Sequence, residues 1–166
     1  MPVLKKANVF LIQIDSSRKN SRSQIYTNVS GKPIFAEDVL LHNRLKLSKE
    51  DFKEHPDFKK VRKNDYLIAY CTPLVPHSPN QIKFIFKVVS KIKNLFVLKT
   101  HTKLQRGYSL EHIYSLVEEG QLSKKMLNAG TKGFHICQVP FSDLELLVNF
   151  DPIVRSYHSS SWKSMT

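Results

Sequence analysis

The sequence has no apolar run that could cross a membrane, and it contains only two cysteines. No apolar stretch approaches the ~18 residues of a transmembrane helix, and residues 1–8 lack the apolar core of a secretory signal. Cys71 and Cys137 lie in apolar contexts, without the C-x-x-C spacing of a redox or zinc motif. Such cysteines are typical of small buried side chains in a reducing compartment. We therefore expect a soluble, cytoplasmic protein with no membrane partner.

The sequence also lacks the motifs of common catalytic and metal sites. Its seven histidines are scattered, and none forms an H-x-x-x-H or H-E-x-x-H pattern. A G-x-S-x-G elbow, a P-loop and a dinucleotide fingerprint are all missing. Cys71 is followed by His77, but a structural cysteine beside a surface histidine is a better interpretation than a nucleophile and its base. We expect no catalytic residue, no metal site and no cofactor.

Acidic residues are scarce relative to basic ones. The 166 residues include 26 Lys and Arg against 14 Asp and Glu, which gives a formal net charge of +12. The sequence pI is about 9.7, and values above ~9 are typical of nucleic-acid-binding domains. The alternative is a generic solubilising surface. With 41% hydrophobic residues, the length suits one domain with a sizeable core.

The strongest structural pattern is a hairpin centred on residues 66–71. This unbroken aromatic and apolar run follows the turn pair Asn64-Asp65 and ends before Pro73, which predicts a short strand buried on both faces. Residues 82–92 are long enough to return beside it. Alternation places Phe84, Phe86 and Val88 on one face. The lysines Lys83, Lys87 and Lys91 then fall on the other face. The proline-rich connection, residues 72–81, is long for a hairpin and is interpreted as a shaped functional loop.

Other elements follow from local patterns. Strands are predicted at 9–14, 24–29, 94–102 and 133–139, whereas residues 36–47 suit a helix or a strand. A capping pattern at Ser48 predicts a helix that ends before Pro56, and Ser109 begins another that Gly120 stops. Residues 121–130 suit a helical turn. The S-x-x-E pair Ser142 and Glu145 predicts a short last helix.

Three strand-to-loop junctions place small polar groups beside strand ends, and two of them include a tyrosine. They comprise Asp15, Ser16 and Ser17, then Tyr26, Thr27 and Asn28, then Tyr70, Cys71 and Thr72. A pocket for one extruded base needs this mixture, because an aromatic wall stacks on the base and polar groups recognise its edge. For any single tyrosine, an ordinary core or rim position is the more common outcome.

The order of these segments resembles the EVE domain of the PUA-like superfamily, which is related to the YTH readers of methylated adenine. The similar features are the first strand with its Ser-rich turn, the segment Lys-Asn-Asp-Tyr-Leu-Ile-Ala-Tyr-Cys-Thr-Pro, and the strand Ile-Lys-Phe-Ile-Phe-Lys-Val-Val-Ser. The resemblance covers about residues 8–150. Asn64 stands where the family has glycine, and asparagine also accepts the left-handed region. Tyr26 is the position most similar to the first wall of the YTH cage.

The resemblance implies an α+β fold, a small mixed β-barrel of the PUA-like, EVE type flanked by helices. It implies that the domain recognises a modified base, methylated in the leading hypothesis, and that it does so by base flipping. It also implies similarity to the DNA-targeting modules of McrBC-type modification-dependent restriction systems. Tyr26 and Tyr70 would be the walls, and the other polar junction residues would bind the base edge. Phosphates would be bound by a basic set, Arg18, Lys19, Arg22, Lys91, Lys93 and Arg106.

Several alternatives remain open from the sequence. DNA is the favoured ligand and RNA the second, and a fused or associated nuclease or nucleoside-triphosphatase is a possible partner. A small-molecule or partner-protein binding module, or an accessory domain of an RNA-modifying enzyme, would use the same barrel pocket. Residues 1–152 are expected to form the domain. Residues 153–166, which include Ser159-Ser160-Ser161, are expected to be a polar tail or the start of a linker.

Overall fold

Two parallel strands, β1 (Val9–Asp15) and β4 (Tyr66–Cys71), form the centre of the fold. The computed structural model describes residues 4–15, 34–35, 43–47, 49–71, 80–131 and 134–150. Every residue of β4 is buried, as its unbroken apolar sequence predicts for a strand covered on both faces. β1 has partners on both sides, which confirms its prediction as a central strand.

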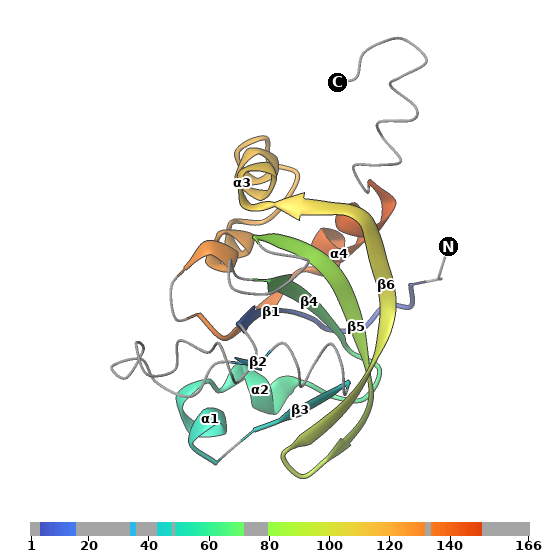
Figure 1. The fold of residues 1–166 in the computed structure, drawn as a ribbon, viewed down its shortest axis with the longest axis vertical. Helices are drawn as coiled ribbons and strands as arrows, with labels where there is room; N and C mark the ends of the chain where they lie inside the picture. The colour runs from blue at the N-terminus through green and yellow to red at the C-terminus, as the bar shows by residue number, and fades with distance from the viewer. Residues whose placement is uncertain are drawn as a thin grey trace.

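The described strands form one mixed, seven-stranded sheet with the order β2-β1-β4-β5-β6-β3. Strand β5 (Gln81–Ile92) is antiparallel to both β4 and β6 (Leu95–Ser109), and β3 (Arg44–Lys46) pairs with the start of β6. On the far side of β1, β7 (Ile136–Val139) pairs with its first half and β2 (Ile34–Phe35) with its end. Figure 1 shows β5 and β6 curving around the β1–β4 pair, which makes a half-barrel.

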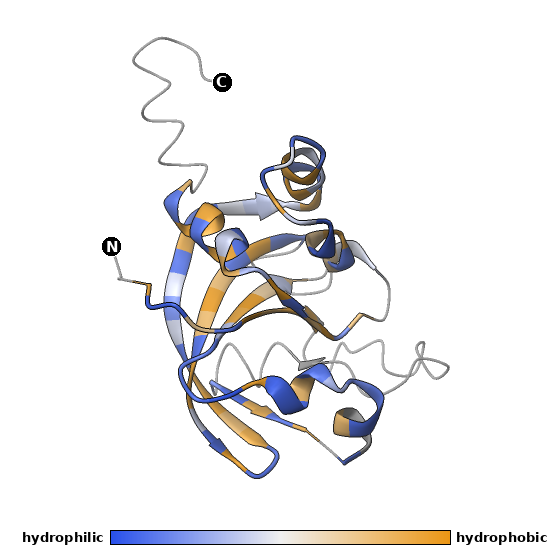
Figure 2. Ribbon diagram, turned by 180° about the vertical axis from the view of Figure 1, so that it is seen from behind, coloured by the Kyte–Doolittle hydropathy of each residue, from blue (hydrophilic) through white to orange (hydrophobic). Residues whose placement is uncertain are grey.

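Strand alternation divides the buried side chains into two cores, one on each face of the sheet. The inner core contains Phe10, Leu67 and Phe86, and α2 (Asp57–Lys60) adds Phe58 to it. The outer core contains Leu11, Ile68 and Ile85. It is covered by α3 (Leu110–Glu118), the 3₁₀ helix η3 (Lys124–Gly130) and α4 (Phe141–Asn149). Figure 2 shows the apolar central strands of the sheet and the helices that cover them, whose ribbons mix apolar and polar residues.

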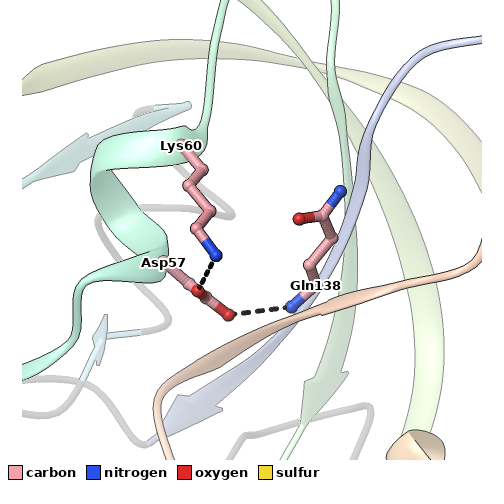
Figure 3. Close-up of polar contacts among 3 residues, drawn as sticks. All are labelled: Asp57, Lys60 and Gln138. Carbon is pink, nitrogen blue, oxygen red and sulfur yellow. Dashed lines mark hydrogen bonds and ion pairs between the residues drawn. The ribbon is translucent and has the colours of Figure 1, made fainter.

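Helix α2 is attached to the edge of the sheet by a polar contact. Asp57 accepts a hydrogen bond from the backbone N–H of Gln138 on β7 at 3.1 Å, and it forms an ion pair with Lys60 at 3.2 Å (Figure 3). Asp57 therefore holds an element from the first half of the chain against the last strand.

Several local predictions are confirmed. Ser109 begins α3 with its hydroxyl accepting a hydrogen bond from the N–H of His112, and Gly120 follows the helix with a φ of +78°. Helix α1 (Lys49–Glu54) ends before Pro56 as expected. Asn64 adopts a φ of +76°, the left-handed conformation that its turn requires.

Three local predictions are wrong. β6 does not end near Thr102 but continues to Ser109, because β5 pairs with it at both ends, from Leu95 to Lys103 and again at Tyr108 and Ser109. α4 begins at Phe141 after Pro140, so Ser142 is not its cap. A register shift between Val88 and Ser90 moves Lys91 onto the inner side of the sheet, over the ring of Phe96. The predicted strand 24–29 and loop segment 72–79 lie outside the described residues.

Candidate nucleic-acid interface

Four strand ends meet at one edge of the sheet. β1 and β4 are parallel, with Ile14 beside Cys71, so both leave the sheet on the same side. Gln81 at the start of β5 is paired with Cys71 and with Ser109 at the end of β6. We call this margin, from Asp15 through Cys71 and Gln81 to Ser109, the carboxyl edge. Two of the three predicted junctions, at Asp15 and at Tyr70, are thus brought side by side.

Tyr70 lies at the carboxyl edge but is packed into the outer core. Its side chain is 3% exposed, and its hydroxyl donates to Oδ1 of Asn80 at 3.3 Å. Burial, with smaller contributions from Tyr114 and Cys71, raises the pKa of the Tyr70 phenol, so it stays a neutral donor. Because its ring is covered, Tyr70 does not offer the stacking wall predicted from the sequence, and its hydroxyl beside Asn80 is the polar group that it contributes to this edge.

Gln13 is a polar side chain of this edge that the sequence analysis did not select. It lies beside Tyr70 in the parallel register. Its amide nitrogen donates to the carbonyls of Ala129 at 3.0 Å and Thr131 at 3.1 Å, which attaches the end of η3 to β1. A single amide within an otherwise apolar strand was the signal that could have identified it.

Cys71 packs in the core and does not act as a nucleophile. Its side chain belongs to the inner core, and burial raises the pKa of its thiol to about 12. Near neutral pH the thiol is therefore protonated and unreactive, which agrees with the structural interpretation of this cysteine.

A large bulge in β6 shapes the end of the carboxyl edge. Ile82 pairs with Tyr108 and Phe84 with Lys103, so the four residues 104–107 lie opposite Lys83 alone. Gly107 adopts a φ of +80°, and the ammonium of Lys83 donates to the carbonyl of Gln105 at 2.5 Å. Bulges of this kind redirect side chains at functional sites. Here the bulge exposes Arg106 beside the carboxyl edge.

The three strands from β4 to β6 carry no acidic residue at all. Between residues 66 and 110 the sequence contains no Asp or Glu. The same stretch contains seven basic residues, Lys83, Lys87, Lys91, Lys93, Lys99, Lys103 and Arg106. This half of the sheet therefore has a positive potential that no carboxylate within it reduces.

Comparisons with known proteins identify the fold. No protein-family model matches the sequence, and no curated protein matches it. The structure matches Rpa0253 of Rhodopseudomonas palustris with a TM-score of 0.54 and 10% identity, over 92% of this chain and 98% of that one. It matches human THYN1, solved in complex with DNA containing 5-methylcytosine, with a TM-score of 0.58 and 10% identity, over 88% of this chain and 98% of that one. The chain has a PUA-like fold of the EVE type.

The EVE-type fold confirms the fold class expected from the sequence. A YTH domain, that of the MRB1 protein of Zygosaccharomyces rouxii in complex with N6-methyladenosine RNA, also matches with 8% identity over 86% of each chain, at a TM-score of 0.44.

The EVE-type fold separates the predicted phosphate-binding residues. Arg106 lies beside the carboxyl edge, whereas Lys91 and Lys93 lie at the opposite end of the sheet. The ammonium of Lys91 donates to the carbonyls of Lys59 at 3.2 Å and Val61 at 2.9 Å. Burial, and then the charge of Arg62, lower the pKa of Lys91, while Asp65 partly opposes them. Lys91 therefore stabilises the end of α2, and Lys93 is exposed.

Nine further site residues were predicted from the sequence. They are Ser16, Ser17, Arg18, Lys19, Arg22, Tyr26, Thr27, Asn28 and Thr72, all outside the described residues. Within the described ranges, no group of three or more His, Cys, Asp or Glu side chains could hold a metal ion. No helix of those ranges is both long and apolar enough to span a membrane.

Proposed function

We propose that this protein binds nucleic acid, DNA in the first instance, and recognises a modified base at the carboxyl edge. The observation that carries the proposal is the fold shared with THYN1, whose structure contains DNA with 5-methylcytosine. The acid-free basic strands β4 to β6 support it, because phosphate contacts supply most of the affinity for a charged duplex.

In this proposal the base is extruded between the end of β1 and the central hairpin. Tyr26 stacks on the base. Asp15, Ser16, Thr27 and Asn28 recognise the edge of the base, together with the hydroxyl of Tyr70. Arg106, with Arg18, Lys19 and Arg22, binds the flanking phosphates. One aromatic stack contributes ~1–3 kcal/mol, whereas unstacking the base costs a few kcal/mol. The phosphate contacts therefore supply the remainder of the affinity.

Binding to matched duplexes tests this proposal. One duplex carries a single 5-methylcytosine and the other an unmodified cytosine, and RNA oligonucleotides with adenosine or N6-methyladenosine form a second pair. We expect tighter binding to the methylated duplex. Tyr26→Ala should lose ~1–3 kcal/mol on that duplex and much less on the unmodified one, which is held mainly through phosphates.

A second measurement does not depend on the variant folding. 2-Aminopurine placed next to 5-methylcytosine in the methylated duplex should brighten when wild-type protein extrudes the methylated base and so unstacks its neighbour. Equal affinity for the methylated and unmodified members of both pairs would overturn base recognition. Preference for the methylated RNA alone would reassign the ligand to RNA, and unchanged fluorescence would exclude base flipping.

The proposal extends to a setting in a modification-dependent restriction system. There the domain brings modified DNA to an associated nucleoside-triphosphatase or nuclease. Phage whose DNA carries the recognised modification should plate less efficiently on cells that express the intact system than the same phage without it. Equal plating would remove this setting and leave base recognition intact.

A further inference from the structure

The turn before β4 presents a cluster of basic side chains at the opposite end of the sheet from the carboxyl edge. Arg62 and Lys63 precede β4 and are exposed, as is Lys59 at the end of α2. Lys93 is exposed in the short turn between β5 and β6. We call these four residues the distal basic surface. β4 has six residues, so at about 3.3 Å per residue roughly 20 Å separate the two ends.

Backbone contacts make this turn rigid. The Asp65 carboxylate accepts hydrogen bonds from the N–H of Arg62 at 2.8 Å and of Asn8 at 3.2 Å. The N–H of Asn64 donates to the carbonyl of Val88 at 2.7 Å. Because the backbone is already ordered, binding of a ligand by Arg62 and Lys63 costs side-chain entropy but little further backbone entropy.

Lys91 brings the parts of the surface together. Its ammonium bridges from β5 to the carbonyls of Lys59 and Val61, and Lys93 follows two residues later with a φ of +54°. A lysine in this left-handed conformation is uncommon, and it fixes where the turn projects its charge. Figure 1 shows the β5–β6 hairpin beside α2, away from the strand ends of the carboxyl edge.

The distal basic surface is not neutralised by the acidic residues around it. Asp65 is buried and accepts hydrogen bonds from backbone donors, and its charge also acts on Arg62 and Lys91. Asp57 is paired with Lys60. Within the described residues, Lys59, Arg62, Lys63 and Lys93 form no ion pair. The charge of the one buried carboxylate, Asp65, offsets these four exposed cations only in part, so the surface stays positive and attracts a polyanion.

We infer that the distal basic surface binds the phosphates of the same nucleic acid, about 20 Å from the carboxyl edge and independently of the modified base. The inference rests on the proposed binding of nucleic acid but not on recognition of a modification. At ~3.4 Å per base pair, the two contacts are about six base pairs apart. The protein therefore needs more duplex than a single base pocket would.

The test compares Arg62→Ala/Lys63→Ala with wild-type protein on methylated and unmodified duplexes over a range of salt concentrations. The affinity of the variant for each duplex should fall by the same factor, on the order of tenfold at low salt. The magnitude of the slope of log affinity against log salt should decrease by up to about 2. Shortening the duplex to about three base pairs on each side of the base should remove this difference between variant and wild type.

The control is Lys49→Ala/Lys53→Ala in α1. It removes the same charge from two exposed lysines, but α1 also contains three acidic residues, so we expect the salt slope to stay unchanged. An unchanged slope and affinity in Arg62→Ala/Lys63→Ala would overturn the inference and leave base recognition standing. Base recognition would be overturned if wild-type protein bound methylated and unmodified duplex equally. If the salt slope still decreased in Arg62→Ala/Lys63→Ala, phosphate binding by the distal basic surface would be supported.

Discussion

Asp143 is a buried carboxylate that connects the two consecutive helices η3 and α4. It accepts hydrogen bonds from the N–H of Ser123 at 3.0 Å and from its hydroxyl at 2.6 Å, and it is 2% exposed. The S-x-x-E pattern predicted Ser142 and Glu145 as a capping pair, but both of these side chains are exposed. The side chain between them attaches the start of η3 to α4.

We expect Asp143→Ala to lower the free energy of unfolding by ~1–3 kcal/mol, because the half-buried N–H and hydroxyl of Ser123 lose their acceptor. Urea unfolding measures the loss. Glu145→Ala, two residues further along the same helix and exposed, should stay within about 0.5 kcal/mol of wild type. Similar losses in both variants would mean that the bridge contributes nothing beyond helix propensity.

Among the elements, β6 determines the form of the carboxyl edge. Its bulge from residue 104 to 107 depends on Gly107, at which an added Cβ would lie 2.8 Å from the carbonyl oxygen of Ile82 and 2.6 Å from the Gln81 side chain. Gly120 has nearly the same φ, +78° against +80°, but an added Cβ there would meet nothing within 4 Å. Substitutions at the two glycines can therefore distinguish the cost of backbone strain from the cost of steric crowding.

Gly120→Ala should therefore lose only the ~1–2 kcal/mol of an alanine in the left-handed region. Gly107→Ala should lose this amount plus the cost of overpacking, a further ~1–3 kcal/mol. The midpoint of urea unfolding at unchanged m-value gives both numbers. Equal losses would show that the bulge relaxes around the new methyl group and that Gly107 is needed for its φ alone.

The whole molecule carries a large excess of positive charge, +12 at pH 7. Repulsion among exposed cations destabilises the compact state, and salt screens it over a Debye length of about 10 Å at 0.1 M. The same salt weakens phosphate binding. Stability and nucleic-acid affinity should therefore respond to ionic strength in opposite directions.

We expect the melting temperature of the free protein to rise by a few degrees between about 20 and 200 mM sodium chloride, which corresponds to ~1 kcal/mol for a chain of this size. Differential scanning fluorimetry measures the change. With saturating duplex the rise should shrink or reverse, since salt removes the stabilising ligand. A melting temperature of the free protein that falls with salt would show that attractive ion pairs outweigh the repulsion.

By itself, the sequence determined the elements whose causes are local. The apolar run 66–71, the Ser109 cap and the left-handed turn at Asn64 depend on residues within a few positions of one another, and all three are as predicted. The carboxyl edge was foreseen in part for the same reason, because strand ends at Asp15 and Tyr70 follow from where each apolar run stops.

Only the tertiary structure decided which strand lies beside which, and what that does to single side chains. Tyr70 is covered because α3 and η3 pack on its face of the sheet. Lys91 changes face because β5 is bulged against β6, and Arg106 is projected by a bulge that exists only when both strands are paired. Register and burial depend on partners distant in sequence, so no local pattern could specify them.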